Sequence, residues 1–350
     1  MRCRVDRSFT LGLRRTRVRS FDSGSIDPDN LPSSRAALWV CDEATRQFLP
    51  SGADPVLVLS RGEAAKNWDS VLKIIDAALS VPLGRDDLVI ALGGGVVCDT
   101  AAFAASIYMR GCGLVLIPST LLSMIDASLG GKTGIDYGTY KNIIGSFYPA
   151  GEILIYPFLL KSLPESEYLS GLAEVLKHAL LEDSDLFSDL SARKSDVLSR
   201  DVRVLNDLIP RSLAVKGRIV EADPTEEGIR AQLNLGHTFG HALESLLGLG
   251  VLPHGHAVAW GIARAMEAGV SLGATDPDYA AEVKKFFTSY GYDLGYRIPD
   301  LGVYLDVLER DKKRKNGEVH FVLQHRRGDT FFTPLSEELL KQVLAPFSDG

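Results

Sequence analysis

Short apolar runs alternate with segments of helical periodicity through the first half of the chain. The runs that we expect to form buried parallel strands are Ala37–Cys41, Pro55–Leu59, Leu88–Leu92 and Leu114–Pro118. Between them, Trp68–Leu79 and Asp99–Tyr108 carry apolar residues at helical spacing. This alternation predicts a doubly wound α/β domain with a ligand crevice at the carboxyl ends of its strands.

The second half of the chain has a different sequence pattern, with few runs of residues that favour β-strands. The segments that we expect to be amphipathic helices are Glu165–Leu181, Asp185–Leu198, Arg200–Glu221, Ala231–Leu247, Ala257–Leu272 and Pro277–Tyr290. The chain of 350 residues is long enough for two domains. We therefore predict an α/β domain over residues 1–155 and a mostly helical domain over residues 156–350.

Charge and hydropathy exclude several classes of protein. The formal net charge is −7, which does not fit a nucleic-acid-binding chain. The longest uncharged stretches are interrupted by Asp99, Arg110 and Asp126 before they reach the length of a membrane span. The segment Met1–Asp6 has no apolar region typical of a signal peptide, and the four cysteines are scattered. We expect a cytoplasmic protein with reduced thiols that binds neither membranes nor nucleic acid.

A glycine-rich turn follows the third apolar run. Gly93–Asp99 lies between a predicted strand and a predicted helix, so backbone N–H groups can face a pyrophosphate. The spacing differs from the common G-x-G-x-x-G fingerprint, and an ordinary tight turn is the alternative. Gly62–Lys66 follows another strand, where Glu63 could hold a ribose hydroxyl and Lys66 could reach the same crevice. A solvated turn is the alternative there.

A second anion site is predicted further along the chain. Asp126–Gly134 combines backbone donors with Lys132, and Lys141 and Asn142 follow a turn-rich stretch. The order does not match a P-loop, and a polar hairpin is the alternative.

The densest group of polar side chains lies in the helical half. Arg230, Asn234, His237 and His241 would share one face if their segment is a helix. His254 and Glu174 supply further ligand types, and two histidines with one carboxylate form a common open zinc site. We expect Glu174, His237 and His254 to be the ligands. Satisfied core histidines are the alternative.

With these segments in view, the chain resembles the 3-dehydroquinate synthase family of sugar-phosphate cyclases from about Asp42 to Gly328. The segments that carry the resemblance are Gly62–Lys66, Gly93–Asp99, Tyr108–Gly111, Ile117–Thr120, Asp126–Gly134, Lys141–Gly145, Ser170–Lys177, Leu233–His241, His254-Gly255 and Asp311–Lys313. The resemblance implies an NAD-binding α/β domain followed by a helical domain that binds metal and substrate.

The resemblance also implies roles for individual residues. The NAD-binding residues would be Asp42, Glu63, Lys66, Gly94, Gly95, Val96, Asp99, Ser119, Thr120, Asp126, Lys141, Ser162 and Leu163. Glu174, His237 and His254 would bind Zn²⁺ or Co²⁺. The substrate would be bound by Arg110, Lys132, Asn142, Lys177, Lys216, Arg230, Asn234, His241 and Lys313. The catalytic residues among these would be Lys132, Lys177, Arg230, Asn234 and His241. Arg110 would come from the neighbouring subunit of a homodimer.

The reaction implied by the resemblance converts 3-deoxy-arabino-heptulosonate 7-phosphate, a sugar acid phosphate, into 3-dehydroquinate and phosphate in the shikimate pathway of aromatic amino-acid biosynthesis. NAD oxidises a ring alcohol, phosphate leaves by β-elimination, the hydride returns, and an intramolecular aldol step closes the carbocycle. The enzyme would be a carbon–oxygen lyase in which NAD acts catalytically.

Some positions depart from the family pattern. His256 stands where a glutamate is usual, and Ser119-Thr120, Asp136 and His178 replace other common residues. His256 beside the expected metal site leaves a cyclase of the amino-dehydroquinate or valiolone type open. A metal-dependent polyol dehydrogenase and a non-catalytic NAD-binding protein also stay open. The set of Lys132, Asn142, Lys177 and Lys313 disfavours a glycerol-type dehydrogenase, which needs no phosphate or carboxylate contacts.

Overall fold

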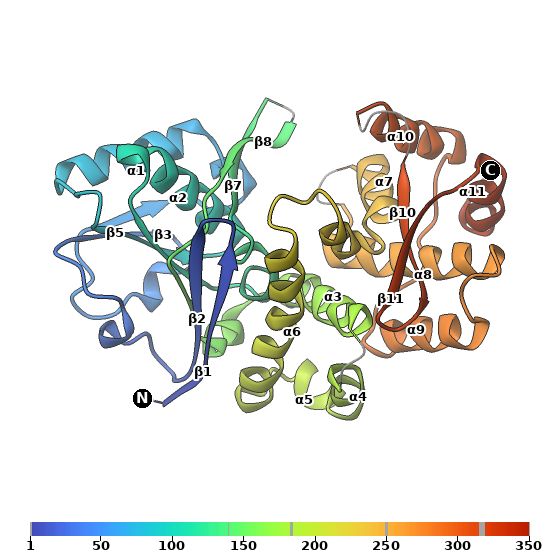
Figure 1. The fold of residues 1–350 in the computed structure, drawn as a ribbon, viewed down its shortest axis with the longest axis horizontal. Helices are drawn as coiled ribbons and strands as arrows, with labels where there is room; N and C mark the ends of the chain where they lie inside the picture. Colours follow the sequence, from blue (N-terminus) through green and yellow to red (C-terminus); the bar gives the residue numbers. More distant parts are fainter. Residues whose placement is uncertain (1, 139, 183–184, 249–250, 315–318, 350) are drawn as a thin grey trace. The chain divides into compact units, whose positions relative to one another are not determined.

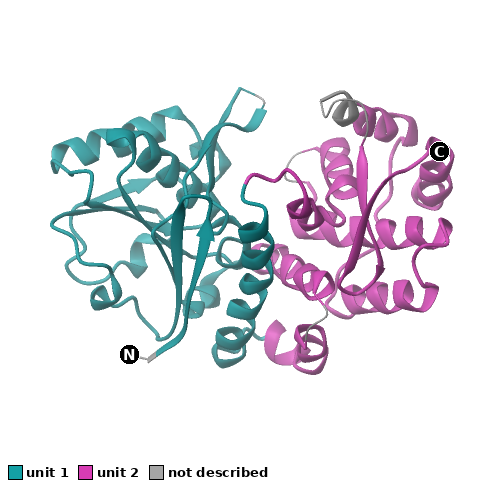
Figure 2. Ribbon diagram, in the orientation of Figure 1, with its two compact units in different colours: residues 1–164, 199–224 teal, residues 165–198, 225–350 magenta. Residues whose placement is uncertain are grey.

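The computed structural model describes residues 2–138, 140–182, 185–248, 251–314 and 319–349, with side chains left out for residues 2 and 310–314. The chain divides into two compact units, drawn in different colours in Figure 2. Unit 1 comprises residues 1–164 and 199–224, and unit 2 comprises residues 165–198 and 225–350.

Unit 1 is built on a seven-stranded sheet, visible around the labels β1, β2, β3 and β5 in Figure 1. Its strands are β1 (Arg2–Leu11), β2 (Arg14–Asp22), β3 (Ala37–Asp42), β4 (Val56–Leu59), β5 (Leu88–Gly93), β6 (Gly113–Pro118) and β9 (Glu152–Ile155). They lie in the order β1-β2-β9-β6-β5-β3-β4. Only β1 and β2 pair antiparallel among these described neighbours, and the other pairs are parallel.

The sheet explains where a ligand crevice can form. Every residue of β5 is buried, as a central parallel strand covered on both faces requires. The chain runs from β3 outward to the edge strand β4 and then returns to β5 on the other side of β3. This reversal of strand order is a topological switch point, and ligands of open α/β sheets bind outside the carboxyl ends of the strands at such a point. Asp42 and Gly93 end the two strands concerned.

Helices and a small hairpin complete unit 1. The helices are α1 (Trp68–Ser80), α2 (Gly95–Ile107) and α6 (Val202–Ala222), and the hairpin is formed by β7 (Lys132–Tyr137) and β8 (Tyr140–Phe147). α1 and α2 pack against each other and against the sheet, whereas α6 packs on β1 and β2. A Cβ on Gly217 of α6 would lie 2.1 Å from the ring of Phe9. The missing side chain at Gly217 therefore lets α6 sit directly on the N-terminal hairpin.

Unit 2 is mostly helical. Its helices are α3 (Glu165–Leu181), α4 (Leu186–Ala192), α5 (Lys194–Leu198), α7 (His237–Leu247), α8 (His254–Ser271), α9 (Pro277–Ser289), α10 (Leu301–Arg314) and α11 (Glu337–Leu344). One antiparallel hairpin, β10 (His320–Arg326) with β11 (Asp329–Pro334), packs beside α8. Helix α8 is buried along most of its length and contacts α3, α7, α9 and α11. It is the central helix of this unit.

Short helices connect these elements in both units. They are η1 (Pro28–Asn30), η2 (Arg46–Phe48), η3 (Glu63–Ala65), η4 (Tyr108–Arg110), η5 (Ser123–Ala127), η6 (Pro157–Ser162), η7 (Ile229–Asn234) and η8 (Ala345–Phe347).

The predicted fold class is confirmed, and two predicted helices are wrong. Asp185–Leu198 forms two short helices, α4 and α5, because α4 ends at the C-cap residue Arg193. The expected parallel strands form β3 to β6, and the helix expected over Glu165–Leu181 has those bounds. The segment Ala231–Leu247 is not one helix, because Gly236 has a left-handed φ of 79° between η7 and α7. The expected division at residues 155 and 156 stays a prediction about domains. The compact units differ from it, since α6 belongs with the sheet of unit 1.

Among the residues that the structure describes, no helix combines the length and the apolar character that crossing a membrane requires.

Candidate active site

The glycine turn after β5 presents the start of α2 without side chains in the way. The backbone carbonyl of Gly93 accepts a hydrogen bond of 2.8 Å from the backbone N–H of Ser119. A Cβ on Gly93 would lie 2.4 Å from the Cβ of Val97, and a Cβ on Gly94 would lie 3.0 Å from Thr120. Among the described residues, no atom lies within 4 Å of the Cβ position of Gly95. The turn is therefore closely packed behind and open in front, which suits a phosphate at the N-terminus of α2.

Asp42 ends β3 on the other side of the switch point. Its Oδ1 accepts hydrogen bonds from the backbone N–H groups of Ala44 and Thr45, at 3.0 and 2.8 Å. The hydroxyl of Thr45 donates to the carbonyl of Leu92, at 2.9 Å. These contacts fix the carboxylate of Asp42 at the carboxyl edge of the sheet, where the resemblance expects it.

The lysine and acids predicted for the cofactor site form ion pairs within unit 1. The Nζ of buried Lys66 lies 2.5 Å from Oδ2 of Asp99. Burial raises the pKa of Asp99, and the ammonium of Lys66 opposes that shift. Glu63 is exposed, and its carboxylate lies 3.7 Å from Nζ of Lys141. The structure thus brings Lys66 and Asp99 together, and separately Glu63 and Lys141.

A second buried lysine pairs with the predicted site residue Asp126. Lys216 of α6 places its Nζ 2.5 Å from Oδ1 of Asp126 and also contacts the backbone carbonyl of that residue. Lys132 and Asn142 are exposed on the hairpin β7–β8, and Asn142 has a left-handed φ of 53°. Its backbone N–H donates to Oδ1 of Asp136 at 2.7 Å. Asp136 of β7 therefore fixes the backbone of Asn142 near the start of β8.

The remaining predicted residues of unit 1 lie in turns. Arg110 is exposed at the end of η4 with a φ of 61°. Ser119 and Thr120 follow β6, and Thr120 caps the next turn through Ser123. Ser162 ends η6, and the carbonyl of Leu163 accepts a hydrogen bond of 2.5 Å from Arg200.

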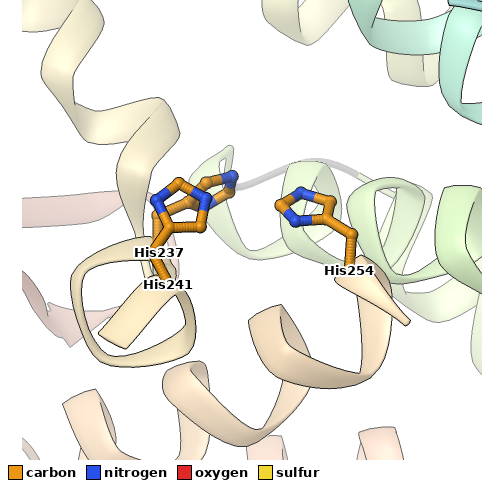
Figure 3. A group of neighbouring side chains, drawn as sticks. All are labelled: His237, His241 and His254. Atoms are coloured by element: carbon orange, nitrogen blue, oxygen red, sulfur yellow. The ribbon is translucent and has the colours of Figure 1, made fainter. Parts of the chain in front are cut away.

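Three histidines of unit 2 converge in space, as Figure 3 shows. His237 and His241 extend from α7, and His254 is the first residue of α8. One ligand nitrogen from each lies within 4.8 Å of the others. The rings of His237 and His254 have centroids 5.4 Å apart. The imidazoles are thus close enough to hold a single metal ion.

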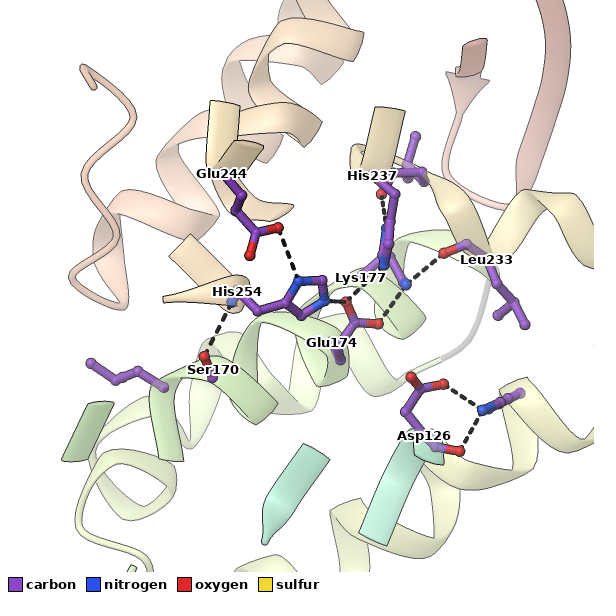
Figure 4. Close-up of polar contacts among 12 residues, drawn as sticks. Asp126, Ser170, Glu174, Lys177, Leu233, His237, Glu244 and His254 are labelled. Carbon is purple, nitrogen blue, oxygen red and sulfur yellow. Dashed lines mark hydrogen bonds and ion pairs between the residues drawn. The ribbon is translucent and has the colours of Figure 1, made fainter. Parts of the chain in front are cut away.

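Glu174 of α3 points into the same cluster (Figure 4). Its Oε1 lies 3.6 Å from Nε2 of His237 and 3.9 Å from Nε2 of His254. Ligand atoms bound to one tetrahedral zinc ion lie roughly 3.3–3.5 Å apart. Both carboxylate oxygens are buried and neither accepts a hydrogen bond from any residue that the structure describes, although the ammonium of Lys177 contacts Oε2. This donor set fits a divalent metal ion.

Lys177 lies one turn after Glu174 and is buried. Its Nζ donates to the backbone carbonyl of Leu233 at 2.6 Å and contacts the Glu174 carboxylate. The ammonium therefore stands beside the metal donors, as the sequence predicts.

The two histidines nearest to Glu174 differ in proton affinity. Burial lowers the pKa of His237 well below its usual range, and the positive charge of Lys177 acts in the same direction. His237 is thus neutral, which is the form that binds metal. Burial also lowers the pKa of His254, but the hydrogen bond to Glu244 and the charge of Glu174 outweigh it, and the net pKa is raised.

Close helix packing brings these side chains together. A Cβ on Gly255 would lie 2.5 Å from the backbone of Ser170 in α3. A Cβ on Gly261 of α8 would lie 2.0 Å from the carbonyl oxygen of Gly236, which precedes α7. Because neither residue has a side chain, α8 approaches both α3 and α7 at backbone distance. The ligands from three helices can then meet.

The predicted helix face is divided between two elements. Arg230 and Asn234 lie on η7, whereas His237 and His241 lie on α7 beyond the left-handed Gly236, so the expectation of a single helix face is wrong. Arg230 is buried. The side chain of Lys313 lies outside the described residues.

Sequence reasoning missed Glu244, whose Oε2 lies 3.3 Å from Nδ1 of His254. The signal was present, because His237, His241 and Glu244 are spaced by four and three residues and so share one face of α7.

Two family models match the chain. The model described as "3-dehydroquinate synthase N-terminal" matches residues 56–170, and the model described as "3-dehydroquinate synthase C-terminal" matches residues 171–314. A curated 3-dehydroquinate synthase from Prochlorococcus marinus (strain NATL1A) is 40% identical over 84% of this chain and 80% of that protein.

Solved structures of cyclases share the fold. A 2-epi-5-epi-valiolone synthase from Streptomyces hygroscopicus subsp. jinggangensis 5008, solved with NAD⁺ and Zn²⁺, has a TM-score of 0.80 and 27% identity, covering 89% of this chain and 91% of that one. A 2-deoxy-scyllo-inosose synthase, complexed with carbaglucose-6-phosphate, NAD⁺ and Co²⁺, has a TM-score of 0.83 and 21% identity, covering 97% and 99%.

Proposed function

Because the chain belongs to the 3-dehydroquinate synthase family, we propose that it converts 3-deoxy-arabino-heptulosonate 7-phosphate into 3-dehydroquinate and inorganic phosphate. It is an enzyme, and the reaction class would be that of a carbon–oxygen lyase. The observation that carries the proposal is the convergence of Glu174, His237 and His254 beside the buried ammonium of Lys177, in a chain of this family.

The residues present fit both cofactors of the proposed reaction. NAD would be held in unit 1 by the turn Gly94–Val96 at the start of α2, with Asp42 at the end of β3. Zn²⁺ or Co²⁺ would be held in unit 2 by Glu174, His237 and His254. When bound, NAD would exchange a hydride with the substrate and the metal would polarise a substrate oxygen.

Side chains of unit 2 supply fixed positive charge for an acidic substrate. The planar guanidinium of Arg230 can bind a carboxylate through two parallel hydrogen bonds, which a lysine cannot do. Buried Lys177 is held in place by the carbonyl of Leu233. We assign Asn234 to a substrate hydroxyl and His241 to the phosphate. Lys132, Asn142 and Lys216 of unit 1, together with Lys313, complete the proposed set, and Arg110 is assigned to the site of a neighbouring subunit in a homodimer. We also expect the enzyme to be cytoplasmic.

The first experiment compares three substrates for phosphate release and carbocyclic product. They are 3-deoxy-arabino-heptulosonate 7-phosphate, its amino analogue and sedoheptulose 7-phosphate. We expect the first to have the highest kcat/KM by far. A preference for the amino analogue or for sedoheptulose 7-phosphate would identify another type of cyclase, in keeping with His256 at a position that is usually acidic.

The same reaction mixtures test the role of NAD. Because the hydride returns to the substrate, substoichiometric NAD should sustain many turnovers without accumulation of NADH. NADH absorbance that grows in proportion to product would instead identify a polyol dehydrogenase.

A matched variant tests the carboxylate contact. Arg230→Lys keeps the positive charge but loses the planar guanidinium that can make two parallel hydrogen bonds to a carboxylate. Losing such a bidentate contact costs about 2–4 kcal/mol, or roughly thirty- to a thousandfold in kcat/KM on the acid substrate. Residual turnover of the carboxylate-free heptulose phosphate should fall far less. An equal loss on both would assign Arg230 to the phosphate or to the fold.

A further inference from the structure

Glu244 is an acidic residue that the proposed reaction does not use, although it lies against the metal donors. It stands on α7, seven residues after His237 and on the same face. Its Oε2 lies 3.3 Å from Nδ1 of His254, as Figure 4 shows. The contact joins α7 to the first residue of α8.

The two histidine donors are held in parallel ways. Nδ1 of His237 lies 3.3 Å from the backbone carbonyl of Leu235, and Nδ1 of His254 lies 3.3 Å from Glu244. In both residues the opposite nitrogen, Nε2, faces Oε1 of Glu174. Each imidazole thus has an oxygen acceptor behind it and the candidate metal position in front of it.

This arrangement matches what a metal-binding imidazole requires. A histidine that binds through Nε2 must be neutral, with its proton on Nδ1, and an acceptor at Nδ1 fixes both the tautomer and the ring orientation. An ionised carboxylate can only accept a hydrogen bond, so Glu244 selects the Nδ1–H tautomer.

His254 needs such a partner more than His237 does. The side chain of His254 is 31% exposed, whereas that of His237 is 14% exposed. His254 is also the first residue of α8, so no preceding helical turn packs against its side chain. Packing therefore restrains the ring of His254 less than that of His237. The orientation of the His254 ring then depends more on the hydrogen bond to Glu244.

We propose that Glu244 is a positioning residue for the metal ligand His254, holding Nε2 toward the metal. The proposal rests on the metal site of the proposed function. Removing a group that hydrogen-bonds to a metal ligand without touching the metal typically lowers metal affinity by about 10- to 100-fold.

The test uses full-length wild type and the variants Glu244→Ala, Glu244→Gln and Glu267→Gln. Glu267 is a matched control, because it is a partly buried acid of the same unit that pairs with Arg264 and Lys284 instead of a metal donor. Each protein is loaded with Zn²⁺, and the transfer of zinc to a chromophoric chelator gives its affinity. The Tm of the zinc-free protein reports on folding.

For Glu244→Ala we expect a loss of zinc affinity of about 10- to 100-fold with little change in the zinc-free Tm. Glu244→Gln should lose less, because its amide oxygen can still accept from Nδ1–H. Glu267→Gln should bind zinc like wild type. Unchanged zinc affinity in both Glu244 variants, with tight binding by wild type, would overturn the role of Glu244 alone. Failure of wild type to bind zinc would overturn the metal site as well.

If Glu244→Ala does not fold, Glu244→Met takes its place, because methionine keeps the length of the side chain but has no oxygen to accept the hydrogen bond from Nδ1–H. Zinc affinity below that of Glu267→Gln at an equal zinc-free Tm supports the proposal, and equal affinity contradicts it.

Discussion

The glycine turn of unit 1 and the metal cluster of unit 2 are built in opposite ways. The turn occupies consecutive residues, Gly93–Asp99, and offers backbone N–H groups. The cluster takes single side chains from α3, α7 and α8, which come together only because glycines allow these helices to approach closely. A site built from backbone groups should therefore fail when a side chain is added to one of its glycines, whereas the cluster should fail when one side chain or one helix contact is lost.

The largest effect is expected from His237→Ala. Loss of one of three ligands should abolish tight zinc binding and lower kcat/KM by roughly a thousandfold or more, beyond the 10- to 100-fold typical of an outer-shell partner. Zinc content after dialysis and kcat/KM are the measurements. His325→Ala is the control, because His325 lies in the same unit but stacks on Phe331. Near-normal zinc content and activity in His237→Ala would show that the ligand assignment is wrong.

The next effect concerns the place where α8 crosses the start of α7, at Gly261 of α8 and Gly236 before α7. In Gly261→Ala the new Cβ would lie 2.0 Å from the carbonyl oxygen of Gly236 and 2.8 Å from the backbone nitrogen of Gly240. No side-chain rotation relieves a backbone clash, so the free energy of unfolding should fall by at least the ~1–3 kcal/mol typical of overpacking. Zinc affinity should fall as well, because the crossing aligns α7 with α8.

Urea unfolding and zinc affinity measure these two losses. The control is Gly24→Ala, where no atom of the described part of the chain lies within 4 Å of the new Cβ. Its free energy of unfolding should stay within about 0.5 kcal/mol of wild type. Weakened folding with intact zinc affinity would mean that the crossing stabilises unit 2 without setting the geometry of the ligands.

A smaller effect is expected from Gly95→Ala in the glycine turn, where NAD affinity should change without a change in folding stability. The new Cβ of Gly95→Ala would meet no atom of the described residues within 4 Å, so the Tm of this variant should match that of wild type. If the turn faces a pyrophosphate, the added methyl group should weaken NAD binding by roughly tenfold or more, about 1.4 kcal/mol. Calorimetric titration with NAD measures the change, and Gly93→Ala, which clashes with Val97, should instead lose stability. Wild-type NAD affinity in Gly95→Ala would favour the interpretation of Gly93–Asp99 as an ordinary turn.

The same contrast explains what the sequence could predict. The strands around the turn and the helix Glu165–Leu181 follow from local periodicity, and the structure places them where the pattern predicts. The break at Gly236 lies inside a continuous apolar pattern, and only the close approach of Ile262 and Val258 of α8 to this residue shows why glycine is needed there. The partners of Lys66 and Lys216 are remote in sequence, so no spacing rule could have paired them with Asp99 and Asp126.

The smallest predicted effect concerns a second locally built feature of unit 1, the start of α6, and tests whether the charge of its N-cap residue contributes to stability. Asp201 caps α6, and its Oδ1 accepts from the backbone N–H groups of Arg203 and Val204 at 2.8 and 3.3 Å. The guanidinium of Arg203 and these backbone donors lower the pKa of Asp201 to about 2, from an ordinary value of 3.8. Because the folded pKa is the lower one, the carboxylate contributes its full stabilisation above pH 3.8 and loses it as the pH falls toward 2.

Asp201→Asn should keep the cap, since asparagine is also a good N-cap residue, but it cannot ionise. The Tm of wild type should therefore exceed that of Asp201→Asn by a few degrees at most near pH 5, and this difference should shrink steadily below pH 4. Asp201→Ala loses the cap itself and should be less stable than Asp201→Asn at every pH. Thermal unfolding of the three proteins from pH 6 to pH 2.5 at constant ionic strength measures the difference directly. A gap between wild type and Asp201→Asn that stays constant across this range would mean that the charge of Asp201 adds nothing to the cap, and that the stability of this helix start depends on its hydrogen bonds alone.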